Sequence, residues 1–195
     1  MPIFTTLQSN AQGINSHGIE LIQFVNDNTN TFHVLYIQET WYQEENILQF
    51  PNYTCLSKNR TTQTREGCAI YVHSSIHFDN ICNDFTSETQ VVDIILGKQT
   101  ITIVNYYNPC KQITHGEIDS LITKVKDKTK AIIVGDFNSH NSIWGSEKTT
   151  PNGRLVENFV LQNDLVILND GSGTRLDPHS GKTSCLDLTL VSCIY

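Results

Sequence analysis

Apolar residues recur along this chain with two different spacings, which together predict a mixture of strands and helices. Short apolar runs bounded by polar turn residues are typical of strands. Such runs lie at 3–8, 32–37, 53–57, 67–72, 91–96, 100–106, 131–134, 165–168 and 184–191. Apolar positions spaced three and four residues apart predict helices at 17–26, 114–128 and 154–162. Hairpins therefore alternate with strand–helix–strand units. This predicts an α/β layered fold with a largely antiparallel pair of sheets and helices outside.

The stretch AIIVGDFNSHNSIWGS, residues 131–146, ends its apolar run abruptly at polar side chains. If the chain stays extended there, Asp136, Asn138 and His140 project from one face, because alternate side chains of an extended segment point the same way. An acid, an amide and an imidazole on one edge suit chemistry at a phosphate ester. The competing interpretation is a plain turn, in which Asp and Asn serve turn geometry.

Polar side chains also follow other expected strands. Asn10 and Gln12 follow the first strand, and two tyrosines with two asparagines lie at 105–108. Glu39 follows the apolar run 32–37, although an acidic residue there could equally favour the first turn of a helix. Asp187 alternates with leucines in the last expected strand, and a carboxylate in such a place is unfavourable unless it is paired or lines a site.

Carboxylates, amides, a tyrosine and a histidine gathered at one edge of a sheet predict a catalytic site. Oxygen ligands of this kind suit Mg²⁺ or Mn²⁺ held together with waters and a substrate phosphate. No GxGxxG, GxxxxGK or HExxH motif is present, and no nucleophile elbow. The residues therefore favour metal-assisted hydrolysis of a phosphodiester or phosphomonoester.

Composition narrows the class of protein. A length of 195 residues predicts one domain, and a net charge of −7 argues against binding nucleic acid through a broad basic face. No apolar stretch approaches the about 20 residues of a membrane span, so no membrane partner is expected. The six cysteines form no CxxC pair, which favours reduced thiols and an intracellular location.

The motifs resemble, in order, those of the endonuclease/exonuclease/phosphatase superfamily. LQSNAQGI, IQETW, EGCAIYV, VNYYNP and GDFN are each similar to one of its motifs. The continuation of GDFN to Trp144-Gly145 resembles the endonuclease domains of non-LTR retrotransposons, as do the stretches NGRLVENFVLQNDLVILNDGSGT and SCLDLTLVS. The resemblance spans nearly the whole chain. It implies a DNase I-like four-layer sandwich, with two mainly antiparallel sheets face to face.

The resemblance also implies a role for each matching residue. Glu39 is similar to the metal-ligating glutamate, and Asn10 to the amide beside metal and phosphate. Tyr107 matches a phenol near the scissile phosphate, with Tyr106 one residue out of register. Asp136 is similar to the acid that orients the attacking water, and Asn138 to an amide that holds a phosphate oxygen. The remaining expected assignments are Asp187, which would hold the ring of a catalytic histidine, and the substrate-binding residues Gln12, His140 and Trp144.

The chain departs from the family at two places. Gln12 and Ser9 stand where the family usually has Asp or Asn and Trp, respectively. The family's final Ser-Asp-His is not found before Tyr195, and neither His140 nor His179 lies in that motif. We therefore expect a single domain over 1–195 that is incomplete at its C-terminus, lacks the last strand or strands, and is either a fragment of a longer protein or impaired in catalysis.

Three functions follow as hypotheses. The first is a Mg²⁺- or Mn²⁺-dependent endonuclease that nicks DNA for a retrotransposon, acting in the nucleus beside a reverse-transcriptase region. The second is a phosphatase acting on inositol lipids or a small phosphoester, and the third is a non-catalytic binding remnant. If DNA is the substrate, loops would read groove shape and phosphates, and Lys58, Arg60 and Arg65 are candidate contacts in one such loop.

Overall fold

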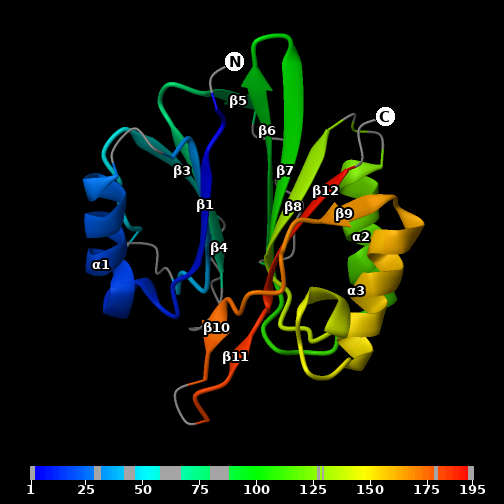
Figure 1. Cartoon of the computed structure of the whole chain (residues 1–195). Helices are drawn as coiled ribbons and strands as arrows, with labels where there is room; N and C mark the ends of the chain where they lie inside the picture. Colours follow the sequence, from blue (N-terminus) through cyan, green and yellow to red (C-terminus); the bar gives the residue numbers. More distant parts are fainter. Residues whose placement is uncertain are drawn as a thin grey trace. The chain divides into compact units, whose positions relative to one another are not determined.

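The computed structural model describes residues 3–28, 32–41, 47–57, 67–79, 88–126, 128, 130–177 and 180–192. They divide into two compact units (Figure 1). Unit 1 contains the described residues up to Thr100 together with Asn105–Tyr107. Unit 2 contains Ile101–Val104 and the described residues from Asn108 onward.

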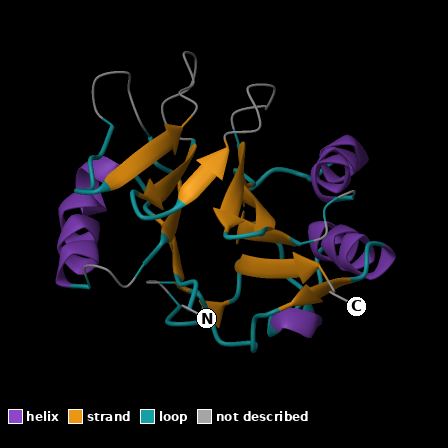
Figure 2. Ribbon diagram, turned by 90° about the horizontal axis from the view of Figure 1, so that it is seen from above, coloured by secondary structure: helices purple, strands orange, loops and turns teal. Residues whose placement is uncertain are grey.

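Unit 1 is built on a four-stranded sheet in the order β1-β2-β4-β3. Its strands are β1 (Thr6–Asn10), β2 (Val34–Gln38), β3 (Tyr53–Ser57) and β4 (Cys68–His73). Strand β1 runs parallel to β2, whereas β4 is antiparallel to both β2 and β3. Helix α1 (Ile14–Asp27) connects β1 to β2 and lies against this sheet (Figure 2).

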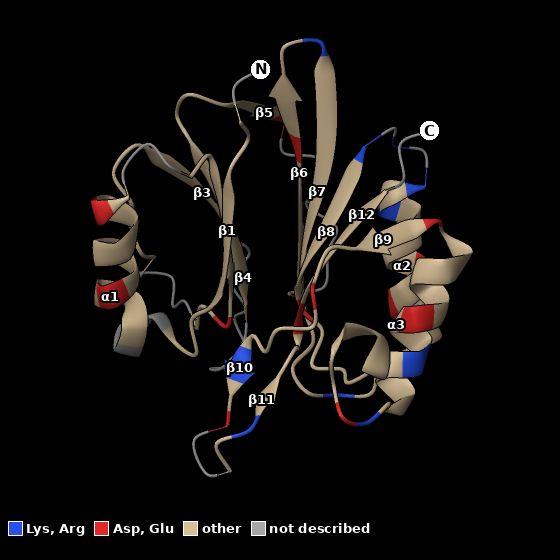
Figure 3. Cartoon of the chain, viewed as in Figure 1, with Lys and Arg blue, Asp and Glu red and all other residues tan. Residues whose placement is uncertain are grey.

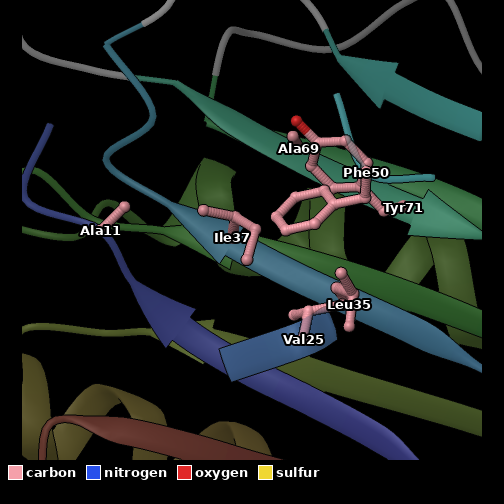
Figure 4. Close-up of a cluster of buried hydrophobic side chains, with 7 residues drawn as sticks. All are labelled: Ala11, Val25, Leu35, Ile37, Phe50, Ala69 and Tyr71. Carbon is pink, nitrogen blue, oxygen red and sulfur yellow. The ribbon is translucent and has the colours of Figure 1, made fainter. Parts of the chain in front are cut away.

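One face of this sheet carries the apolar core of unit 1 (Figure 4). Leu35 and Ile37 of β2 pack there with Val25 of α1, and Phe50 stacks edge-on against Tyr71 with ring centroids 4.8 Å apart. Because side chains alternate along a strand, Tyr36 and Gln38 point to the opposite face of β2. Gln38 is nevertheless fully buried, which is unusual for an uncharged polar side chain and bears on the site below.

The second sheet has the order β5-β6-β7-β8-β12-β9. Its strands are β5 (His77–Asp79), β6 (Thr89–Leu96), β7 (Gln99–Tyr107), β8 (Ala131–Asp136), β9 (Leu165–Ile167) and β12 (Asp187–Ser192). Strand β7 contributes residues to both units. Strands β10 (Arg175–Leu176) and β11 (Thr183–Ser184) form a separate two-stranded hairpin.

Helices α2 (His115–Val125) and α3 (Pro151–Gln162) pack together in unit 2. Each buries one apolar side, with Leu121 at the centre of the α2 face and Phe159 at the centre of the α3 face. In the described part of the chain, three α-helices and two main sheets give an α/β fold, as the sequence predicts. No helix among the described residues is long and apolar enough to cross a membrane.

Acid should weaken α2 through its first turn. Thr114 and Glu117 form a capping box, and Lys111 lies 3.2 Å from the Glu117 carboxylate. Burial acts to raise the pKa of Glu117, but the hydrogen bonds from Thr114 and the Lys111 ammonium together hold it below its ordinary value. A lowered folded-state pKa stabilises the protein above the unfolded value of about 4.3, and that stabilisation is lost as the pH falls through the folded value.

We therefore expect Glu117→Gln to lower the free energy of unfolding by about 0.5–1 kcal/mol at pH 7. The difference from wild type should shrink as the pH falls below about 4.3, and it should vanish only below the lowered folded-state pKa, where Glu117 is neutral in both states. Urea unfolding of both proteins at pH 7 and pH 3 measures this difference in the free energy of unfolding. A difference that is equal at both pH values would show that the carboxylate charge contributes nothing.

The structure corrects the sequence predictions in three places. Helix α1 begins at Ile14 rather than near His17, and its N-cap is Gly13, which offers no side-chain cap. Strand β5 and the β10–β11 hairpin were not expected, because their strands are only two or three residues long. The expected strand 184–191 is divided, because Thr174 Oγ1 accepts hydrogen bonds from the N–H groups of both Leu186 and Asp187. Asp187 therefore lies at the start of β12 rather than inside a longer strand.

Candidate functional site

The ends of β1 and β2 bring two predicted site residues of unit 1 into direct contact. The strands are parallel, with Asn10 in register with Gln38, so both end at the same edge of the sheet. Asn10 Nδ2 donates a hydrogen bond of 2.9 Å to Glu39 Oε1. A carboxylate and an amide 29 positions apart in sequence thus form one polar group, as expected for neighbouring parallel strand ends.

The backbone around this pair is tightly constrained. The Ala11 N–H donates to the Gln38 carbonyl, and the Gly13 N–H donates to the Glu39 carbonyl, each at 2.9 Å. Glu39 itself has φ of +51°, a left-handed conformation that is uncommon for a residue with a side chain. Such conformations persist only where surrounding contacts hold them, and they concentrate at functional sites. Gln12 also has positive φ, and its N–H donates to Asn10 Oδ1 while its side chain is exposed.

Tyr107 lies at the end of β7, also within unit 1. Its N–H donates to the Glu88 carbonyl at 2.9 Å, and its side chain is largely buried. Asn105, two residues earlier, donates to the carbonyl oxygens of Ile37 and Ala69 in β2 and β4. Alternation places Tyr107 on the same face of β7 as Asn105 and places Tyr106 on the other face. Tyr107 therefore lies on the same face of β7 as Asn105, whose side chain contacts the main chain of β2 and β4.

In unit 2, Asp136 and Asp187 are directly opposite each other. Asp136 ends β8, Asp187 begins β12, and the two are register partners of an antiparallel pair. Directly opposed residues project to the same face with Cβ atoms about 5 Å apart. Asp136 is 4% exposed, so one of these two carboxylates is buried. Like charges in this position destabilise a sheet unless other groups compensate them, which is typical of a site rather than of simple packing.

Asn138 is fixed against the end of β8 by its own hydrogen bonds. Its N–H donates to Asp136 Oδ1 at 2.8 Å, and its Nδ2 donates to the Asn108 carbonyl at 2.7 Å. Asn108 in turn donates through its N–H to the Asp136 carbonyl and through Nδ2 to the Phe137 carbonyl. Asn108 is fully buried and holds both predicted residues in place. In the sequence, Asn108 is visible as a polar residue at a strand end, but nothing in its neighbourhood distinguishes it as a site residue.

The expected extended run from Asp136 to His140 is not present. Strand β8 ends at Asp136, and Asn138 adopts a left-handed conformation with φ of +44°. His140 instead lines a separate cavity of about 250 Å³ between the segment 146–150 and the β10–β11 hairpin. Ser146, Lys148 and Lys182 also line this cavity. The shared-face argument for His140 was therefore wrong, because the chain turns at Asn138.

Trp144 is fully buried, and its Nε1–H donates to the Ser139 carbonyl at 3.2 Å. A side chain with no exposed surface and a satisfied N–H has nothing to offer a substrate. The expectation that Trp144 contacts the substrate is therefore corrected: the indole belongs to the core beneath the loop that follows Asp136.

Among the described residues, the Lys and Arg side chains belong to unit 2, apart from Lys98 at the turn between β6 and β7 (Figure 3). The candidate DNA contacts Lys58, Arg60 and Arg65 lie outside the described residues.

The donor set of unit 1 fits a hard divalent cation. Among the described residues no group of three or more His, Cys, Asp or Glu side chains is arranged to hold a metal ion. Mg²⁺ does not require such a group, because it usually keeps several waters and takes one or two carboxylates together with substrate phosphate. Glu39 presents its carboxylate at the strand edge with Oε1 oriented by Asn10. At metal sites, a side chain that binds the metal commonly has a hydrogen-bonding partner that orients it.

Sequence comparison finds similar proteins among those associated with reverse transcriptases. A family model described as "Endonuclease-reverse transcriptase" matches residues 101–193. The RNA-directed DNA polymerase from the mobile element jockey of Drosophila melanogaster is 22% identical over 170 residues. That match covers 85% of this chain but 18% of the relative, so the chain spans less than a fifth of the relative's length.

Solved structures share the fold. The endonuclease domain of TRAS1, a telomere-specific non-LTR retrotransposon, superposes with a TM-score of 0.79 at 23% identity, covering 97% of this chain and 84% of that one. The AP endonuclease LMAP from Leishmania major gives 0.71 at 14% identity, covering 98% and 79%. The 3'-5' exonuclease NExo from Neisseria meningitidis gives 0.67 at 18% identity, covering 97% and 86%. These likenesses confirm the DNase I-like α/β fold.

Proposed function

We propose that this chain, whose resemblance to the endonuclease/exonuclease/phosphatase superfamily the comparisons confirm, is a metal-dependent endonuclease that nicks DNA. The observation that carries the proposal is the contact between Asn10 and Glu39 at the parallel ends of β1 and β2. It supports the proposal because an oriented carboxylate beside an amide suits a divalent cation and a phosphate. A buried carboxylate at the end of β8 supports it.

In unit 1, Glu39 and Asn10 would hold a Mg²⁺ or Mn²⁺ ion. Such an ion neutralises phosphate charge and stabilises the leaving oxygen during in-line attack. Asn10 orients the Glu39 carboxylate through its Nδ2–H, which limits the rotamers that Glu39 can adopt. Tyr107 would donate a hydrogen bond from its phenolic O–H to a phosphate oxygen, and Gln12, which is exposed beside Asn10, would contact the substrate.

In unit 2, Asp136 would orient the attacking water and accept its proton. The Asn138 N–H at 2.8 Å fixes the Asp136 carboxylate for that task. An amide NH₂ has two donors, and the Asn108 carbonyl occupies one of those of Asn138. The second N–H would hold a phosphate oxygen. Asp187, opposite Asp136, would orient the ring of a catalytic histidine. His140 would contact the substrate from the separate cavity that it lines.

The proposed biological setting follows from the mobile-element relatives. The match to an RNA-directed DNA polymerase supports a reverse-transcriptase region as partner, with DNA as substrate. Acting on chromosomal DNA would require a nuclear location.

Nicking of supercoiled plasmid tests this function. We expect relaxation in Mg²⁺, loss of it in excess EDTA, and recovery when Mg²⁺ is restored. Glu39→Gln should raise the Mg²⁺ concentration for half-maximal nicking by at least about 10-fold, because it removes the charge that holds a hard cation. Glu20→Gln is the matched control, since Glu20 lies exposed on α1.

Three other results would point elsewhere. Nicking that persists in EDTA would contradict the metal requirement. Release of phosphate from a small phosphoester without nicking would favour the phosphatase. DNA binding without hydrolysis, in a chain that unfolds cooperatively, would favour the binding remnant.

A further inference from the structure

Two buried amides of unit 1, Gln38 and Asn105, are hydrogen-bonded to each other and have no place in the chemistry above. Both side chains are fully buried. Gln38 Nε2 donates to Asn105 Oδ1 at 2.5 Å, joining the last residue of β2 to the end of β7, 67 positions later. Amides are rarely buried without a purpose, because each brings donors and acceptors that must be satisfied.

The orientation of both amides follows from their partners. Asn105 Nδ2 lies 3.0 Å from the Ala69 carbonyl oxygen and 3.3 Å from the Ile37 carbonyl oxygen. Carbonyl oxygens only accept, so this atom must be the NH₂ group and the remaining atom must be Oδ1. Gln38 must therefore turn its own NH₂ group toward Asn105. This leaves Gln38 Oε1 buried without a hydrogen-bond partner among the described residues.

An unsatisfied acceptor makes this pair a poor choice for stability alone. Replacing a buried polar pair by apolar side chains of similar shape is often neutral or stabilising. Natural proteins depart from such packing rules mainly at functional sites. The retained amides therefore indicate a role beyond filling space.

The pair also lies where it can set the geometry of the predicted metal ligands. Gln38 directly precedes Glu39 and is the register partner of Asn10. Its carbonyl accepts the Ala11 N–H, so its main chain is tied to the Asn10 loop while its side chain is tied to β7. Asn105 bonds the main chain of both β2 and β4, and it shares a face of β7 with Tyr107.

We propose that Gln38 and Asn105 are positioning residues, whose amide pair holds the ends of β2 and β7 so that Glu39, Asn10 and Tyr107 can bind a divalent cation and a phosphate. This inference rests on the proposed function. It assigns the two amides no contact with substrate. Losing an outer-shell partner typically weakens metal binding or activity by about 10- to 100-fold.

The test compares Gln38→Met with the double variant Gln38→Met/Asn105→Leu. The single variant leaves Asn105 Oδ1 without its donor, whereas the double variant removes both amides and so stays informative if the single variant fails to fold. Thr89→Val is the control, because Thr89 is also a buried polar side chain of unit 1. Mn²⁺ affinity is measured by electron paramagnetic resonance without DNA, together with kcat and KM for nicking and urea unfolding.

We expect the double variant to stay folded but to be less stable than wild type, because the Ile37 and Ala69 carbonyls lose the Asn105 donor. We expect it to bind Mn²⁺ about 10-fold more weakly and to lose about 10-fold in kcat. KM for DNA should change by less than about 2-fold, since the pair touches no substrate. Unchanged Mn²⁺ affinity and kcat in a folded double variant would overturn the positioning role while leaving the endonuclease proposal intact. A wild-type chain that neither binds Mn²⁺ nor nicks DNA would overturn both.

Discussion

Asp136→Asn is expected to reduce plasmid nicking by about 1,000-fold or more. A positioned general base contributes about 10²- to 10⁴-fold to a hydrolytic rate, and an amide cannot accept the proton of the attacking water. The replacement is isosteric, and the new Oδ1 can still accept the Asn138 N–H. The free energy of unfolding should stay equal or rise, because the repulsion with Asp187 directly opposite is relieved.

The combination of lost activity and retained stability is what identifies the role. Nicking rates measured at saturating Mg²⁺, together with urea unfolding, separate the two effects. Asp119→Asn on the exposed side of α2 is the matched control and should leave both unchanged. An Asp136→Asn variant that retains more than about a tenth of wild-type nicking would remove Asp136 from the proposed chemistry.

Trp144→Ala is expected to lower the free energy of unfolding by about 3–5 kcal/mol, the range for truncating a fully buried large aromatic side chain. The change also leaves the Ser139 carbonyl without the Nε1–H that it accepts. Native domains are stable by only about 5–15 kcal/mol, so much of this variant should be unfolded at 37 °C. Thermal unfolding followed by circular dichroism measures the loss.

Trp144→Phe keeps most of the buried volume and separates packing from substrate contact. We expect it to lose less stability than Trp144→Ala and to nick plasmid with nearly wild-type KM. A large rise in KM in a folded Trp144→Phe variant would restore the original view of Trp144 as a substrate contact.

Much of the fold could be predicted from the sequence because its signals are local. The apolar run 53–57 coincides with β3, and apolar positions three and four residues apart predicted the helix near 114–128. The structure adds a capping box between Thr114 and Glu117, which is also a contact between near neighbours in the chain. The same local character explains the misses. A hairpin of two-residue strands such as β10–β11 carries too few alternating positions to be recognised.

The candidate site was predicted less completely, because its decisive contacts join distant segments. Gln38, Asn105 and Asn108 are residue types that are ordinary in turns and at strand ends. Only their burial and their hydrogen bonds distinguish them. Trp144 was misassigned for the related reason that a motif gives the order of residues but not their exposure.

By itself the sequence determined the kinds of chemical group available and the points where strands end in polar residues, since hydrophobic periodicity and turn chemistry depend on near neighbours in the chain. It could not determine which strand ends meet. The hydrogen bond between Asn10 and Glu39 and the opposition of Asp136 and Asp187 depend on strand register. Register is set by pairing between segments 29 and 51 positions apart, and a shift of one residue would turn these side chains to the other face of the sheet.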